Sequence, residues 1–233
     1  MKNNLTEKDI ETLNKFGLEI NDKEKIFNIK KLNISNDKIK YIPTEFFKLI
    51  NLEELFIYCR SLRKLPKEIG NLTNLKELYI DCKSLRKLPE DIKNLINLKR
   101  LKISCYDLEL TRKIGKLINL ETLYIWSDVD GLIELPKEIG NLTNLKILDI
   151  ECYNLKELPK EIFNLINLEK LSIRINNLEI SPDGIEKLIN LENLYIDINI
   201  INENFNFKSL PIEEMGKLNN LKEFDIRIRK EEK

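Results

Sequence analysis

The sequence contains no histidine and only seven glycines among its 233 residues. Without histidine, the chain cannot build a Ser-His-Asp or Cys-His catalytic site or an H-E-x-x-H metal site, and it lacks the usual general base of enzymes. The glycine-rich phosphate-binding patterns G-x-x-x-x-G-K-[ST] and G-x-G-x-x-G do not occur either. We therefore expect no catalytic residue, no metal and no cofactor, and interpret the protein as a non-enzyme.

The chain also lacks an excess of either charge and any long apolar run. Lysine plus arginine and aspartate plus glutamate both number 39. This balance argues against nucleic acid as a partner, because phosphate binding usually needs a clear basic excess, although a local basic patch is compatible with it. The first residues, Met1 to Lys8, have no apolar segment typical of a secretion signal, and no stretch reaches the length of a membrane span. We expect a cytoplasmic protein that binds no membrane; the alternative is export without a Sec-type signal.

What the sequence has instead is a repeat. The stretch from Leu65 to Lys76 recurs letter for letter from Leu135 to Lys146. Each copy leads into an L-x-x-L-x-I run, and such runs begin at positions 22 to 30 residues apart, each directly after an asparagine. The runs begin at Ile29, Leu52, Leu75, Leu98, Leu120, Leu145, Leu168, Leu191 and Leu221.

The L-x-x-L-x-I run predicts one short strand per unit. Its second Leu and its Ile are two residues apart, so both point to one side of an extended chain and the residues between them to the other. Stacked in parallel, such strands bury their apolar sides together and form one long sheet. The asparagine before each run lies where the chain turns into the strand. Its side-chain amide is expected to bond free backbone groups at this corner and in the next repeat. Pro66 and the apolar residues after it are spaced as in a short helical turn on the outer face.

These units, L-P-x-E-I-G-N-L-x-N-L-x-x-L-x-I, resemble the 23-residue leucine-rich repeats of bacterial proteins and of Ras-group proteins in plants and animals. The resemblance implies an α/β solenoid, a right-handed curved horseshoe with a parallel concave β-sheet and short helical or 3-10 turns on its convex side. It also implies that the concave sheet binds other proteins. The Ras-group resemblance adds small GTPases as one partner class, with low weight because bacterial proteins share the pattern.

The pattern divides the chain into three parts. Residues 1–28 are expected to form an N-terminal helical cap, with a helix that starts at Thr6; residues 29–228 a solenoid of nine repeats; and residues 229–233 a charged tail. The fourth repeat has Thr111 where others have proline, which predicts an irregular convex side there. The fifth contains a small loop before Gly131, and the eighth an insertion at 202–208 whose Phe205 and Phe207 either pack on the neighbouring repeat or meet a partner.

Four cysteines occupy one column, two residues after the strand isoleucine. Ser127, Ile175, Ile198 and Ile228 hold this place in other repeats, and alternation predicts that the whole column points into the core. We interpret the thiols as packing groups, since successive repeats spread them along the solenoid axis rather than around a metal. The tripeptide Cys105-Tyr106-Asp107 matches the C-x-D motif of bacterial leucine-rich-repeat ubiquitin ligases, but no separate helical domain follows it, so we attribute it to chance. The column contains Cys59, Cys82, Cys105 and Cys152.

The outward positions of the strands are the candidate binding site. Large aromatic side chains on the solvent side of a sheet gain little for folding, and aromatic residues and arginine are the usual anchors of protein interfaces. We expect a monomer that binds a protein or peptide here; the alternatives are a spacer or self-associating solenoid and, with least support, a ligase-type effector. The predicted contact residues are Phe56, Tyr58, Tyr79, Asp81, Arg100, Lys102, Tyr124, Trp126, Glu151, Arg174 and Tyr195.

Overall fold

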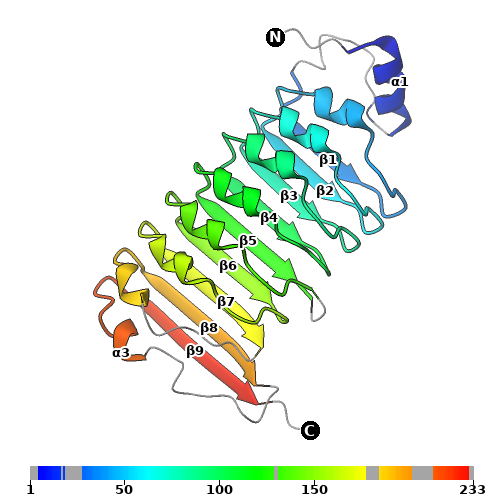
Figure 1. Cartoon of the computed structure of the whole chain (residues 1–233). Helices are drawn as coiled ribbons and strands as arrows, with labels where there is room; N and C mark the ends of the chain where they lie inside the picture. Colours follow the sequence, from blue (N-terminus) through cyan, green and yellow to red (C-terminus); the bar gives the residue numbers. More distant parts are fainter. Residues whose placement is uncertain are drawn as a thin grey trace.

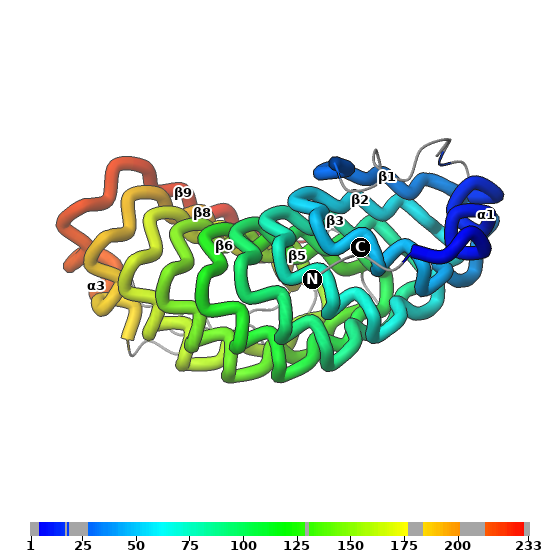
Figure 2. Tube along the Cα trace, turned by 90° about the horizontal axis from the view of Figure 1, so that it is seen from above, coloured from blue at the N-terminus to red at the C-terminus, as the bar shows by residue number. Residues whose placement is uncertain are grey.

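The computed structural model describes residues 5–16, 18, 28–128, 131–176, 184–200 and 212–230. Within these residues, nine parallel strands form one sheet, and each strand pairs with the next one in the chain. The coils lie side by side along a curved axis, with the sheet on one side and short helical turns on the other (Figures 1 and 2). The strands are β1 (Lys31–Ser35), β2 (Glu54–Tyr58), β3 (Glu77–Asp81), β4 (Arg100–Ser104), β5 (Thr122–Ser127), β6 (Ile147–Cys152), β7 (Lys170–Asn176), β8 (Asn193–Ile200) and β9 (Glu223–Lys230).

A short 3-10 helix follows each strand from β1 to β7, and the four-residue helix α3 (Ile212–Met215) follows β8. Most of these 3-10 helices begin directly after a proline in extended conformation, which has no N–H to leave unpaired at that point. The open sheet with convex 3-10 turns confirms the predicted solenoid. The 3-10 helices are η1 (Thr44–Lys48), η2 (Lys67–Asn71), η3 (Glu90–Asn94), η4 (Arg112–Lys116), η5 (Lys137–Asn141), η6 (Lys160–Asn164) and η7 (Ile185–Lys187).

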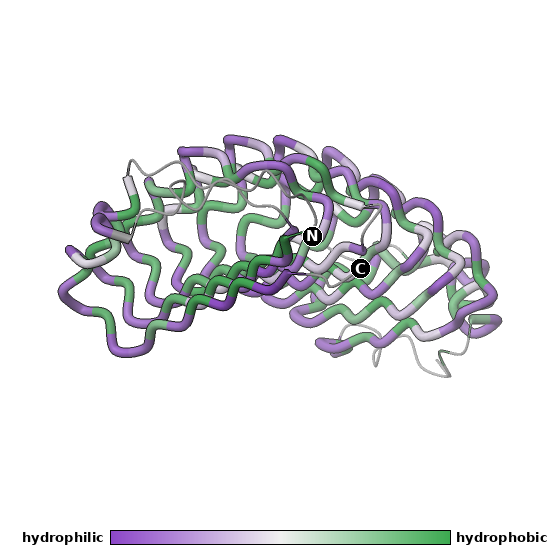
Figure 3. Tube along the Cα trace, turned by 90° about the horizontal axis from the view of Figure 1, so that it is seen from below, coloured by the Kyte–Doolittle hydropathy of each residue, from purple (hydrophilic) through white to green (hydrophobic). Residues whose placement is uncertain are grey.

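The core runs the length of the solenoid as continuous columns. Equivalent residues of adjacent repeats pair in register, so that Leu55 lies beside Leu78 and Ile57 beside Ile80. All four cysteines are fully buried, which confirms the predicted inward column. Figure 3 shows the consequence, since apolar stretches of successive coils lie next to one another. In the last strand, however, Ile228 of the same column is 37% exposed, because no further described repeat packs over it.

The convex turns approach one another closely, and this explains their glycines. A Cβ atom added to Gly115 would lie 2.3 Å from the backbone oxygen of Glu138, and one added to Gly140 equally close to that of Glu161. Neither oxygen can withdraw without moving its own turn. Glycine is therefore the residue that fits at positions 115 and 140 without a shift of the next turn, although η3 and η6 carry Lys93 and Phe163 at the equivalent place.

The predicted hydrogen bonds of the repeat asparagines are present, but they lead to the preceding repeat and not to the next one. Each side-chain amide donates to a carbonyl of the preceding repeat, not the next one; Asn97, for example, donates to Thr73 O at 2.8 Å. The accepting carbonyl lies at the corner between a 3-10 helix and a strand, outside both hydrogen-bonding patterns, and is therefore free to accept. The donors are Asn74, Asn97, Asn119, Asn144, Asn167, Asn190 and Asn220.

The predicted irregularity of the fourth repeat is wrong. Helix η4 has the same length as its neighbours, and Thr111 adopts the extended conformation that proline adopts elsewhere, with φ −70° and ψ 143°. Its hydroxyl accepts from Lys113 N and donates to a Glu90 carboxylate oxygen at 3.0 Å. The threonine thus starts the turn by capping, where proline does so by its fixed backbone angle.

At the N-terminal end of the solenoid, α1 (Glu7–Lys15), a helix in the predicted place, packs against η1. Thr6 and Asp9 bond each other's backbone N–H groups in a capping box, and Leu13 is fully buried. Strand β9 ends the sheet at the other side and continues to Lys230. None of the described helices is long and apolar enough to cross a membrane.

Candidate functional site

The concave face carries three parallel rows of side chains along the whole sheet and a fourth along β7 to β9, because the strands pair in register. One row contains Phe56, Tyr79, Lys102, Tyr124, Asp149, Ser172, Tyr195 and Asp225. The next contains Tyr58, Asp81, Ser104, Trp126, Glu151, Arg174, Asp197 and Arg227. All the predicted contact residues lie on this face, but Arg100 belongs to the third row, where it pairs with Glu77 rather than joining the aromatic residues.

Aromatic side chains gather on β2 to β5. The rings of Phe56 and Tyr79 stack with centroids 5.1 Å apart. Next along the row, the ammonium group of Lys102 lies 5.8 Å from the ring centroids of both Tyr79 and Tyr124. The Lys102 side chain thus bridges two aromatic faces and holds its charge on the concave surface.

A hollow of about 440 Å³ lies in this aromatic region. Tyr58, Tyr79, Tyr124 and Trp126 supply its aromatic surface, with Lys102 between them. Burial raises the pKa of Tyr124, and the nearby carboxylate of Asp149 raises it further. The acids Asp81, Asp149 and Glu151 also line the hollow, so its carboxylates outnumber its single cation.

Two tyrosines that extend this face were missed by the sequence prediction. Tyr106 follows β4 and packs against Trp126 with ring centroids 5.9 Å apart, while the ammonium group of Lys83 lies 4.7 Å from the centroid of the Tyr106 ring and bonds its hydroxyl. Tyr153 follows β6 and donates to Glu151 at 2.7 Å. Both residues come directly after a cysteine of the inward column, so one more step of the strand alternation would have placed them outward.

The other half of the concave face is held together by ion pairs. Arg174 contacts a Glu151 oxygen at 2.5 Å and an Asp197 oxygen at 3.7 Å. Arg229 reaches the same Asp197 oxygen at 2.8 Å. Burial raises the pKa of Asp149 at the border of this network, although Ser172 and nearby cations oppose the rise. The charges of this half pair with one another, and they include Glu151, which also lines the aromatic hollow.

The cysteine and acidic motifs do not form reactive sites. Burial raises the pKa of the Cys105 thiol far above its ordinary value, and its side chain is fully buried, so the C-x-D tripeptide offers no accessible thiolate. Residues 129–130 of the small loop before Gly131 lie outside the described residues; next to them, Gly131 N donates to Asp128 O in a turn. Among the residues that the structure describes, no three carboxylates or thiols converge as metal ligands do.

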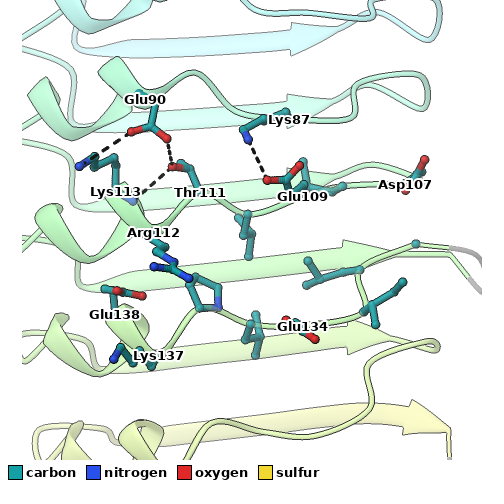
Figure 4. Close-up of a pocket in the computed structure, with 17 residues that line it drawn as sticks. Lys87, Glu90, Asp107, Glu109, Thr111, Arg112, Lys113, Glu134, Lys137 and Glu138 are labelled. Carbon is teal, nitrogen blue, oxygen red and sulfur yellow. Dashed lines mark hydrogen bonds and ion pairs between the residues drawn. The ribbon is translucent and has the colours of Figure 1, made fainter.

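A larger hollow of about 870 Å³ lies on the flank of the solenoid, beside the segments that lead into η4 and η5 (Figure 4). Its charges are mixed and partly paired among themselves. Lys87 contacts Glu109 at 2.8 Å, and Lys113 lies 3.9 Å from Glu90. No aromatic side chain lines it, and neither sign of charge dominates. We therefore place the candidate site on the concave sheet. The insertion at 202–208, with Phe205 and Phe207, lies outside the described residues.

The comparisons with known proteins agree with this architecture. The family model of a leucine-rich repeat region matches residues 9–132 and again 112–233, which together span nearly the whole chain. The chain is a leucine-rich repeat protein. Members of this family typically serve as protein-interaction modules, because the stacked repeats present an extended concave surface. No curated protein matches the sequence.

Solved structures of other leucine-rich repeat proteins share the fold. A repeat protein of Leptospira interrogans is 26% identical, with a TM-score of 0.60; the match covers 87% of this chain but 55% of that one. The leucine-rich repeat domain of the type III effector XopL is 24% identical, with a TM-score of 0.65 and coverage of 85% and 68%. Internalin C2 of Listeria monocytogenes is 21% identical, with a TM-score of 0.59 and coverage of 89% and 83%. The last two likenesses show the fold alone.

Proposed function

We propose that this repeat protein is a non-catalytic interaction module that binds a protein or peptide on the concave sheet, with the aromatic hollow of β2 to β6 as the anchor point. The observation that carries the proposal is the hollow itself. Half-buried aromatic rings surround it without closing it, and such rings are the usual anchors of protein interfaces. We include a cytoplasmic location in this proposal, in keeping with four unpaired cysteine thiols.

The charges around the hollow favour a particular kind of partner residue. Asp81, Asp149 and Glu151 face the same space as the four aromatic rings, with Lys102 as the opposing charge. A lysine or arginine of the partner would lie over an aromatic face and pair with a carboxylate at its edge. We therefore expect the partner to place a lysine or arginine side chain in the hollow, carried on an otherwise apolar segment.

The test uses affinity capture from the source cells, followed by titration calorimetry with the captured protein. The Tyr124→Ala/Trp126→Ala variant removes two walls of the hollow and should weaken binding by about thirtyfold or more, the loss expected for roughly 2 kcal/mol at an interface anchor. Tyr41→Ala is the matched control, because it also removes an aromatic ring, one that is 68% exposed and lies outside the sheet.

Equal affinity of the wild type and the double variant would refute the concave site. A further variant tests the charge assignment: Asp81→Asn leaves the aromatic walls intact and should weaken binding several-fold, most clearly at low salt. Tighter binding of Asp81→Asn would show that the partner presents an acidic rather than a basic side chain.

A further inference from the structure

Strand β9 is an open sheet edge of unusual length. It has eight residues and pairs along all of them with β8, whereas β1 to β4 have five residues each. On its other side, no strand among the described residues pairs with it. A long unpaired edge presents a row of backbone donors and acceptors that another strand can use.

The apolar side of β9 is exposed as well. Phe224 is 50% exposed and Ile228 37%, whereas their partners on β8, Leu194 and Ile198, are fully buried. Ile226 lies between them and is partly buried. The edge therefore combines free backbone groups with an apolar strip, and both would be covered by one added strand.

The charges of β9 are ordered along the strand. On its concave side the sequence runs Glu223, Asp225, Arg227, Arg229, with two acids before Ile226 and two bases after it. This order is complementary to itself in the antiparallel direction. In a pair of strands related by a two-fold axis at Ile226, Glu223 of each copy lies opposite Arg229 of the other, and Asp225 lies opposite Arg227.

We propose that β9 pairs antiparallel with β9 of a second copy of this chain, about a two-fold axis at Ile226. The same register brings Phe224 of each copy opposite Ile228 of the other and the two Ile226 side chains opposite each other, so the apolar strip is also self-complementary. The interface is isologous, as in most homodimers, and joins the two sheets into one. The dimer takes the place of the monomer that we expected from the sequence.

The ion pairs of the single chain are compatible with this exchange. Arg227 contacts Asp225 of its own strand at 2.7 Å, and both side chains are substantially exposed, at 62% and 39%. Pairing of two copies lets each Arg227 turn from the Asp225 beside it to the one opposite. Arg229 contacts Asp197 of β8 at 2.8 Å and Glu223 accepts from Asn193 at 2.9 Å, so these two side chains would share or exchange their partners in the pair, while backbone hydrogen bonds are added.

Head-to-tail stacking is disfavoured by the other end of the solenoid. A ring or filament would need β9 of one copy to pack against β1 of the next. On β1, however, Leu32 and Ile34 are each only 6% exposed, because their apolar side is already covered. Of the two terminal strands, β9 exposes its apolar side chains and β1 does not, which favours a closed dimer over a chain of copies.

The first test is the mass in solution as a function of concentration, by sedimentation equilibrium. We expect the wild type to rise with concentration from 27.6 kDa towards twice that value. Asp225→Arg and Arg227→Asp each place like charges opposite each other in the proposed pair, and each variant alone should remain monomeric at concentrations where the wild type is dimeric. Arg63→Asp is the control for charge reversal, since Arg63 is exposed and lies outside the sheet.

The decisive test mixes the two variants. One copy then carries two bases at positions 225 and 227 and the other carries two acids, so both cross-strand pairs are complementary again and the mixture should dimerise. A wild type that stays monomeric at all concentrations would overturn the proposal. Dimers of the single variants would place the contact elsewhere, and a monomeric mixture would overturn the antiparallel register.

Discussion

The two ends of this solenoid face the same physical problem and solve it differently. Every inner repeat covers the apolar face of its neighbour, so the first and last repeats are each left with one face to cover. At the N-terminal end, Leu13 of helix α1 is fully buried, and Leu32 and Ile34 of β1 are each 6% exposed. At the C-terminal end, Phe224 and Ile228 of β9 remain 50% and 37% exposed.

This difference shows which part of a repeat protein is free to take on a role beyond folding. Helix α1, with its capping box, its ion pair to Lys48 and its buried leucine, packs on η1 at the first repeat. The last strand keeps its apolar strip exposed and carries charges whose contacts lie on β8 and β9 themselves. The comparison predicts that equivalent substitutions at the two ends have very different effects on the stability of the single chain.

The largest effect is expected for Leu13→Ala. Its side chain is fully buried between α1 and the first repeat, and replacing a buried leucine by alanine lowers the free energy of unfolding by about 2–5 kcal/mol. Urea unfolding measures the loss. Because repeat proteins unfold in neighbouring units, hydrogen exchange should show faster exchange in α1 and β1 and little change in β8. Uniform loss of protection along the whole sheet would contradict the role of α1 as a local cap.

A smaller effect is expected for Asp9→Asn. The Asp9 carboxylate accepts from Thr6 N at 2.7 Å and from Lys48 Nζ at 2.7 Å, so it joins the helix start to η1. Loss of these charge-assisted bonds should cost about 1–2 kcal/mol, the range seen for helix-capping contacts. Glu11→Gln removes the same charge from an exposed position of α1 and should leave stability nearly unchanged.

The same contacts make the N-terminal cap sensitive to acid. Burial opposes ionisation of Asp9, but the hydrogen bonds from Lys48 and Thr6 outweigh it and hold its pKa below the ordinary value of 3.8. A lowered pKa in the folded state means that the carboxylate stabilises the fold at neutral pH and that this contribution is lost as the pH falls below about 4. Acid titration followed by hydrogen exchange should therefore open α1 in the wild type, and Asp9→Asn should show no further loss of α1 in that range.

Features that are determined within one repeat could be predicted from the sequence, whereas features that depend on contacts between repeats could not. The repeat period alone fixed the strands, the inward cysteines and the outward aromatic residues, because each follows from alternation along one chain segment. The direction of the asparagine bonds and the regular turn at Thr111 depend on how one repeat sits on the next, and both were predicted wrongly. The partners of Asp197 and the flank hollow beside Arg112 depend in the same way on contacts between repeats.

The self-complementary order of the charges on β9 could be predicted from the sequence only in part. The alternation of Glu223, Asp225, Arg227 and Arg229 is visible in the sequence, where part of it was assigned to a charged tail that protects the edge. Only the structure shows that the strand runs to Lys230 and that its apolar side is exposed. The same charges then favour one partner strand in one register.

The smallest effect on the single chain is expected for Phe224→Ala, and it separates the two ends most sharply. Half of this side chain is already in water, so its loss should lower the free energy of unfolding of the monomer by about 1 kcal/mol or less at high dilution. At concentrations where β9 pairs with a second copy, the same substitution should also weaken dimerisation, because Phe224 then packs against Ile228 of the other chain. Unfolding of the wild type and the variant should therefore differ little in dilute solution and increasingly with concentration. A large loss at every concentration would mean that Phe224 acts as a cap like Leu13, and that both ends of the solenoid are closed.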